Sequence, residues 1–142
     1  MRNSKPILLV EDDDIDVMII KRAFRTLEVP NQLVCFSDGK KALEFLRDGG
    51  NEKPCLIFLD LNMPWTNGWE LLEIISTDDM LRDIPIVILT TSYRKEDQNR
   101  AETFRPTVIG YMTKPPDYQK TVAVIRRQLE ELNLIQLENA TR

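Results

Sequence analysis

The sequence predicts an α/β fold: a doubly wound, five-stranded parallel sheet with helices on both faces. Short apolar runs alternate along the chain with segments whose apolar residues recur at helical spacing. Strands separated by helices pair in parallel through right-handed crossovers. The length of 142 residues suffices for one domain with a sizeable core and not for two.

The first half of the chain holds two strand and helix units. Residues 7–10 form the first buried strand, and apolar residues then recur at helical spacing until Pro30 ends the helix. Residues 32–36 form the second strand. A short amphipathic helix follows it, and Gly49 with Gly50 closes that helix.

The third strand, residues 56–59, is four apolar residues in a row, which is typical of a strand covered on both faces. Pro64 and Gly68 make the segment after it a shaped loop. The next helix carries Trp69 on its apolar face, where a core position is expected. Trp65 lies in the loop, where a contact with a partner protein is the alternative to simple exposure.

The last two units complete the pattern. Residues 86–89 form the fourth strand, and residues 95–104 form a polar helix that we expect to be the least firmly packed. Residues 108–113 form the fifth strand, and the last helix starts near Asp117. Its apolar stripe fits packing on the sheet and a homodimer contact equally well; the stripe consists of Val122, Ile125, Leu129 and Leu132.

Composition excludes several classes of protein. Lys and Arg total 19 against 23 for Asp and Glu, so the net charge is −4, which argues against a nucleic-acid partner. No apolar run approaches the ~18 residues that a membrane span needs. The N-terminus shows no secretory h-region. We therefore expect a cytoplasmic protein with no nucleic-acid and no membrane partner.

Cysteine and histidine usage narrows the chemistry further. Cys35 and Cys55 lie in apolar runs without metal-type spacing, so we expect buried core thiols. The chain has no histidine. This excludes histidine-based general base catalysis, histidine–zinc sites and a phosphohistidine carried by this chain.

The residues that follow the expected strands carry the polar chemistry. Parallel strands end at one edge of the sheet, and ligands bind there where the strand order reverses. Carboxylates without histidine or thiolate favour Mg²⁺, while a hydroxyl and an ammonium suit phosphoryl oxygens. The residues delivered to this edge are Glu11, Asp12, Asp13, Asp60, Thr90 and Lys114.

Each of these residues also has a plainer interpretation. The acidic run at residues 11–16 could cap a helix and complement its dipole, a role that can coexist with metal binding. Asp60, Thr90 and Lys114 could each be an ordinary residue at a strand end. Their joint arrival at one edge favours a site for a phosphoryl group.

Four motifs in order resemble the receiver domain of two-component response regulators. They occupy residues 10–13, 60–64 with Gly68, 89–92 and 111–115. The similarity runs from about residue 7 to residue 134. It implies strand order 2-1-3-4-5 and a single receiver domain over residues 1–142, with its core at about 6–134 and a short tail at 135–142.

The resemblance also implies roles for the site residues. Asp60 would accept a phosphoryl group from a sensor histidine kinase or a histidine phosphotransfer protein. Asp12 would bind Mg²⁺ directly, Glu11 largely through water, and the backbone carbonyl of Asn62 would add a ligand. Lys114 would hold phosphoryl oxygens and be followed by a cis peptide bond to Pro115.

Two further pairs of residues follow from the same resemblance. Thr90 and Tyr111 match the switch positions, although Tyr111 could be simply a half-buried strand aromatic. Asn62 and Ser92, two positions beyond Asp60 and Thr90, would tune how long the phosphoryl group lasts. The implied strand order would place the two cysteines roughly 10 Å apart, too far for a disulfide.

At the subfamily level, the sequence looks like the small stand-alone receivers associated with bacteriophytochrome-type kinases. A receiver is a switch that acts on a downstream protein and not an enzyme, beyond assisting its own phosphorylation and dephosphorylation. One alternative is a Mg²⁺-dependent phosphatase of the haloacid-dehalogenase type, which typically has an aspartate where this chain has Asn62. Another is a phosphorylation-independent binding module, which would usually have lost Asp12, Asp60 or Lys114.

Overall fold

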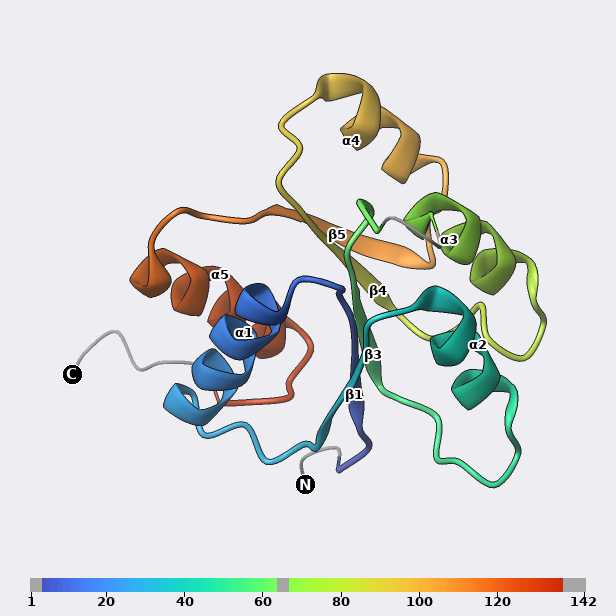
Figure 1. Cartoon of the computed structure of the whole chain (residues 1–142). Coiled ribbons are helices and arrows are strands. Elements are labelled where there is room, and N and C mark those ends of the chain that lie inside the picture. Colours follow the sequence, from blue (N-terminus) through green and yellow to red (C-terminus); the bar gives the residue numbers. More distant parts are fainter. Residues whose placement is uncertain (1–3, 64–66, 137–142) are drawn as a thin grey trace.

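A computed structural model describes residues 4–63 and 67–136 of the protein. These residues form a five-stranded parallel sheet in the order β2-β1-β3-β4-β5, which confirms the expected order (Figure 1). The strands are β1 (Ile7–Val10), β2 (Leu33–Phe36), β3 (Leu56–Leu59), β4 (Ile86–Thr90) and β5 (Val108–Thr113).

Helices cover both faces of this sheet (Figure 1). Side chains of successive strand residues point to opposite faces, so Ile7 and Leu9 pack under one layer of helices, and Leu8 and Val10 under the other. The first layer consists of α1 (Asp14–Thr26) and α5 (Tyr118–Glu131), and the second of α2 (Gly39–Arg47), α3 (Gly68–Thr77) and α4 (Lys95–Glu102).

Local sequence explains where most helices begin. Asp13 caps α1, because its carboxylate accepts hydrogen bonds from the backbone N–H groups of Ile15 and Asp16. Asp38, Asn67 and Asp117 cap α2, α3 and α5 in the same way. Such caps satisfy N–H groups that have no partner within the helix.

Helix α4 is the polar helix expected to be the least firmly packed, and Ala101 is its buried residue. The helix ends at Glu102, two residues before the expected end.

Trp69 of α3 is 8% exposed, which confirms its core position. It stacks on Phe104, and Arg100 lies 4.3 Å from its ring centroid. Trp65 lies outside the described residues.

The expectation of buried core thiols is wrong. Cys35 and Cys55 are free, as expected, but both are only half-buried. Cys35 lies on β2, an edge strand whose residues are all partly exposed, and Cys55 precedes β3 at the opposite end of the sheet from the acidic residues. Burial is nevertheless sufficient to raise the pKa of each thiol.

The stripe on the last helix is used within the chain. Val122, Ile125 and Leu129 are buried against the sheet and α1, and Leu134 and Ile135 join the same cluster. Ile135 is 9% exposed, so packing continues one residue beyond the expected core.

Among the described residues, the cis peptide bond lies between Arg105 and Pro106. The expected cis bond between Lys114 and Pro115 is therefore wrong. The trans form is the intrinsically favoured one, and with it Lys114 already reaches the acidic residues.

No helix in the described part of the chain is long and apolar enough to cross a membrane.

Candidate functional site

Three carboxylates gather where β1 and β3 end. The two strands pair in register, Val10 beside Leu59, so the residues that follow them emerge side by side. One carboxylate oxygen from each of Glu11, Asp12 and Asp60 lies within 4.8 Å of the other two. Glu11 is 1% exposed and Asp60 4%, so this negative charge is largely removed from water. A cation is needed to stabilise such a cluster.

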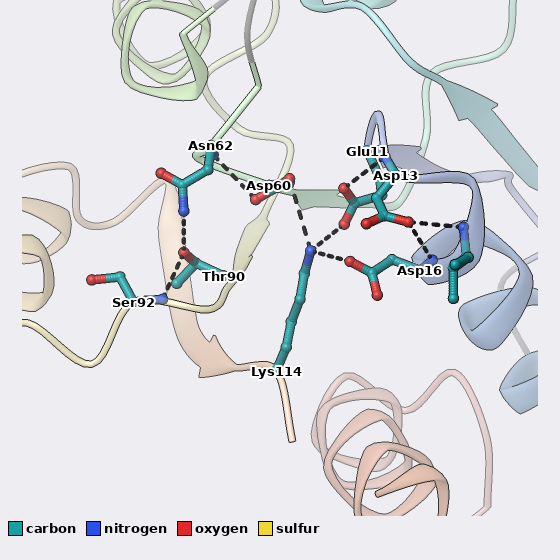
Figure 2. A network of polar contacts seen from close by, with 9 residues as sticks. Glu11, Asp13, Asp16, Asp60, Asn62, Thr90, Ser92 and Lys114 are labelled. Atoms are coloured by element: carbon teal, nitrogen blue, oxygen red, sulfur yellow. Dashed lines mark hydrogen bonds and ion pairs between the residues drawn. The ribbon is translucent and has the colours of Figure 1, made fainter. Parts of the chain in front are cut away.

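Lys114 supplies one cation from the end of β5. Its backbone N–H donates to the carbonyl of Thr90 at 2.7 Å, which ties the residue to the neighbouring strand. Its Nζ lies 2.5 Å from Glu11 Oε1, 2.8 Å from Asp16 Oδ2 and 3.8 Å from Asp60 Oδ2. The ammonium therefore points into the carboxylate cluster, as Figure 2 shows.

Burial and the close approach of acids and Lys114 shift the pKa values at the site. Burial and a hydrogen bond with Asp60 raise the pKa of Glu11 to about 8, although Lys114 acts in the opposite direction. For Lys114, burial favours a lower pKa, but hydrogen bonds to Asp16 and Glu11 outweigh it and the pKa is raised. One ammonium thus leaves the buried carboxylates incompletely neutralised.

The donor set fits a magnesium ion. It consists of oxygen atoms alone, from three carboxylates at mutual distances that one ion can bridge. The chain has no histidine, and hard oxygen donors favour Mg²⁺ over zinc. The ammonium of Lys114 already acts as a stand-in cation beside Glu11. Glu11, Asp12 and Asp60 therefore suit the ion expected from sequence.

The rest of the acidic run is divided between two tasks. The carboxylate of Asp13 is committed to the start of α1, so the helix-capping interpretation applies to that residue. Asp16, one turn along the helix, binds the ammonium of Lys114 instead (Figure 2). Sequence reasoning did not assign this role to Asp16. The sequence feature that could have indicated this role is the position of Asp16 in the first turn of α1, which begins shortly after Glu11 and Asp12.

Thr90 ends β4 and is fully buried. Its hydroxyl oxygen accepts a hydrogen bond from the side-chain amide of Asn62 at 3.3 Å and one from the backbone N–H of Ser92 at 3.2 Å. The backbone N–H of Asn62 donates to Asp60 Oδ1 at 3.1 Å. A chain of hydrogen bonds thus runs from Asp60 through Asn62 and Thr90 to Ser92. The metal-binding role of the Asn62 carbonyl stays a prediction.

Ser92 and Tyr111 lie on the far side of Thr90. The Ser92 side chain points away from Asp60 (Figure 2), and its hydroxyl donates to Asp97 Oδ2 at 2.6 Å. Tyr111 is half-buried on β5, and its hydroxyl donates to the carbonyl of Ser92 at 3.1 Å. Burial raises the pKa of Tyr111. The expected switch residues are therefore joined through Ser92.

Gly68 fixes the backbone on which Asp60 sits. A Cβ atom at this position would lie 2.6 Å from the carbonyl oxygen of Asp60 and 2.6 Å from the Cα of Leu61. The first residue of α3 thus presses directly against the end of β3. Only glycine allows this approach without moving the backbone.

The chain is similar to known proteins over most of its length. The model of the family described as "Response regulator receiver domain" matches residues 7–126. The probable methanogenesis regulatory protein FilR2 of Methanothrix harundinacea is 38% identical over 129 residues, covering 89% of this chain and 79% of that protein.

Solved structures give the same result. The phosphorylated cyanobacterial phytochrome response regulator RcpA is similar with a TM-score of 0.81 and 33% identity, covering 90% of this chain and 93% of that one. The Mn²⁺-bound form of response regulator Rcp1, a protein of Synechocystis sp., gives a TM-score of 0.81 and 30% identity, with 94% and 97% covered.

Proposed function

Because the chain belongs to the response regulator receiver family, we propose that it is a phosphorylation-controlled switch of a two-component phosphorelay whose phosphoacceptor is Asp60. One observation carries this assignment. Asp60 lies within 4.8 Å of the Glu11 and Asp12 carboxylates and 3.8 Å from the Lys114 ammonium. A nucleophilic carboxylate, metal-binding acids and a fixed cation are what phosphoryl transfer requires.

The donor is a phosphohistidine on a sensor histidine kinase or a histidine phosphotransfer protein. An oxygen of Asp60 forms the new bond to phosphorus while the bond between phosphorus and the donor's histidine nitrogen breaks. Lys114 and Thr90 then bind the phosphoryl oxygens by charge and by hydrogen bonding. Lys114 has to exchange part of its contact with Glu11 and Asp16 for this new partner.

Mg²⁺ would be held by Asp12 and Asp60, by Glu11 largely through water and by the backbone carbonyl of Asn62. When bound, the ion offsets the negative charge that gathers on the phosphoryl oxygens during transfer. The chain's own residues do the rest. Asp60 attacks, Lys114 and Thr90 hold the transferred group, and Asn62 lies beside the path of water that later removes it.

Phosphorylation shifts the population between two arrangements. The hydroxyl of Thr90 leaves Asn62 and Ser92 and turns to the phosphoryl group, and Tyr111 moves inward into the vacated space. These changes alter the surface formed by α4, β5 and α5. A downstream protein binds that surface, and a homodimer through the last helix is a second use of it.

The kinase is of the bacteriophytochrome type. Support comes from the similarity to the phytochrome response regulator RcpA and from the resemblance noted in the sequence. The protein acts in the cytoplasm, where such kinases present their phosphohistidine. It promotes only its own phosphorylation and dephosphorylation and turns over no separate substrate. Phosphotransfer from a panel of purified kinases tests this choice.

The alternatives from other classes are less favoured. A haloacid-dehalogenase-type phosphatase needs an acid near the nucleophile to protonate the leaving group, and Asn62 instead donates its amide to Thr90. A binding module that ignores phosphate does not need Asp12, Asp60 and Lys114 together.

Replacing Asp60 by Asn tests the proposal. We expect wild-type protein incubated with Mg²⁺ and a small acyl phosphate to gain one phosphoryl group by intact-protein mass spectrometry, and Asp60→Asn to gain none. Asp13→Asn is the matched control, because it removes the same charge from the same edge and Asn caps a helix as well as Asp does. Undiminished labelling of Asp60→Asn would remove Asp60 as the acceptor.

A further inference from the structure

The hydroxyl of Ser92 is held by α4 instead of facing the phosphorylation site. It donates to Asp97 Oδ2 at 2.6 Å and accepts a hydrogen bond from the backbone N–H of Arg94 at 3.2 Å. In Figure 2 the side chain points away from both Asn62 and Asp60. A hydrogen bond to a carboxylate is roughly twice as strong as one between neutral groups, so Asp97 fixes this orientation.

The backbone of Ser92, by contrast, belongs to the site. Its N–H donates to the hydroxyl of Thr90, which also accepts from Asn62. Rotation about one side-chain bond, between staggered positions, turns the Ser92 hydroxyl away from α4. Asn62 and Asp97 line the same groove of about 550 Å³. Solvent that enters this groove therefore borders both Asn62 and the carboxylate that holds the Ser92 hydroxyl.

We propose that Asp97 is a positioning residue that holds the Ser92 hydroxyl away from the site and thereby prolongs the life of the phosphoryl group on Asp60. The proposal rests on the function proposed above. It assigns to the first turn of α4 a role in timing that acts entirely through Ser92.

The chemistry that Asp97 restrains is hydrolysis of the phosphorylated Asp60. The oxygen of a water molecule forms a bond to phosphorus, and the bond from phosphorus to the Asp60 oxygen breaks with its electron pair left on the carboxylate. The water's proton ends on the released inorganic phosphate or in solvent. A freed Ser92 hydroxyl accepts a hydrogen bond from this water. That hydrogen bond orients the water so that a lone pair of the water oxygen is directed at phosphorus.

Asp97→Ala removes the restraint, and Glu96→Ala is its matched control. Both substitutions delete one carboxylate from the first turn of α4, but Glu96 binds Arg94 and is 74% exposed. The assay labels each protein with a small acyl phosphate and Mg²⁺, removes the donor and follows loss of the phosphoryl group by mass spectrometry. Asp97→Ala is expected to lose it on the order of threefold to tenfold faster than wild type, the range given by one ordinary hydrogen bond. Glu96→Ala is expected to keep the wild-type lifetime.

The dependence on Ser92 separates positioning from a general effect on charge or folding. In a Ser92→Ala background, Asp97→Ala should change nothing further, because the hydroxyl on which it acts is gone. Equal phosphoryl lifetimes for Asp97→Ala and wild type overturn the inference. It is also overturned if Asp97→Ala accelerates loss of the phosphoryl group equally with and without Ser92, or if Glu96→Ala accelerates it as much. If Asp60 is labelled in all variants, these outcomes leave the proposed function intact. Failure of wild type to be labelled overturns both.

Discussion

Replacing Gly68 by Ala tests whether the first turn of α3 positions Asp60. The new Cβ would meet the carbonyl oxygen of Asp60 and the Cα of Leu61 at 2.6 Å each. Ordinary contact begins at 3.4 Å, so the two segments have to separate by about 0.8 Å. Both contacts are with backbone, so no side chain can swing aside, and the displacement reaches Asp60 directly.

Two effects of opposite sign compete in this variant. Alanine in a helix is preferred over glycine by roughly 0.5–1 kcal/mol, whereas forcing an extra carbon into a packed interior costs about 1–3 kcal/mol. The steric effect should win because the clash is with fixed backbone. The net loss is then at most about 2.5 kcal/mol, so we expect the midpoint of thermal unfolding to fall by up to about 10 °C. The rate of Mg²⁺-dependent labelling should fall on the order of tenfold, since a displacement near 1 Å at a reacting group carries penalties of this size or larger.

Gly49→Ala provides the control for this experiment. No atom lies within 4 Å of a Cβ at Gly49, and its φ is not positive, so its stability and labelling should match wild type or improve slightly. Calorimetry and labelling with a small acyl phosphate measure both variants. A Gly68→Ala protein as stable and as readily labelled as wild type would refute the argument that this contact positions Asp60.

Two further predictions follow from the charges and thiols. Lys114→Met leaves buried carboxylates unpaired and should lower the free energy of unfolding, measured by denaturant titration without metal, by about 3–5 kcal/mol, with part of the loss regained in MgCl₂. Arg105→Met, which breaks the exposed pair with Glu102, is the control and should cost at most about 1 kcal/mol in the same titration. Equal losses in the two variants would contradict the buried-pair argument. Since burial raises the pKa of Cys35 and Cys55 and the thiolate is the reactive form, alkylation of the folded protein should increase with pH at a higher midpoint than in denaturant; coincident pH profiles would show that the thiols are not shielded.

Sequence predicted the parts of the site that depend on where strands end. An apolar run that stops at a polar residue marks the edge of the sheet, and parallel strands bring all such ends together. For this reason Glu11, Asp60, Thr90 and Lys114 could each be named before their distances were known. Trp69 could be placed in the core from helical spacing, because its neighbours repeat on one face.

Burial of the cysteines could not be predicted from apolar runs. Cys35 lies on β2, which the implied strand order already makes an edge strand, and Cys55 lies just before the central strand β3. Local sequence does not distinguish an edge strand from a central one when both are apolar. The exposure of each thiol depends on the strands, loops and helices that surround it in the folded sheet, which an apolar run in the sequence does not specify.

What the sequence by itself determined is the identity and order of the residues at the carboxyl edge, because strand and helix periodicity are local properties. Only the tertiary structure decided which partners those residues take. Asp16 binds the ammonium of Lys114, Asp97 turns Ser92 away from Asp60, and Gly68 packs against the Asp60 backbone. These contacts join segments from different strand and helix units or depend on side-chain rotamers. They are set by how the helices pack over the sheet, which no local pattern encodes.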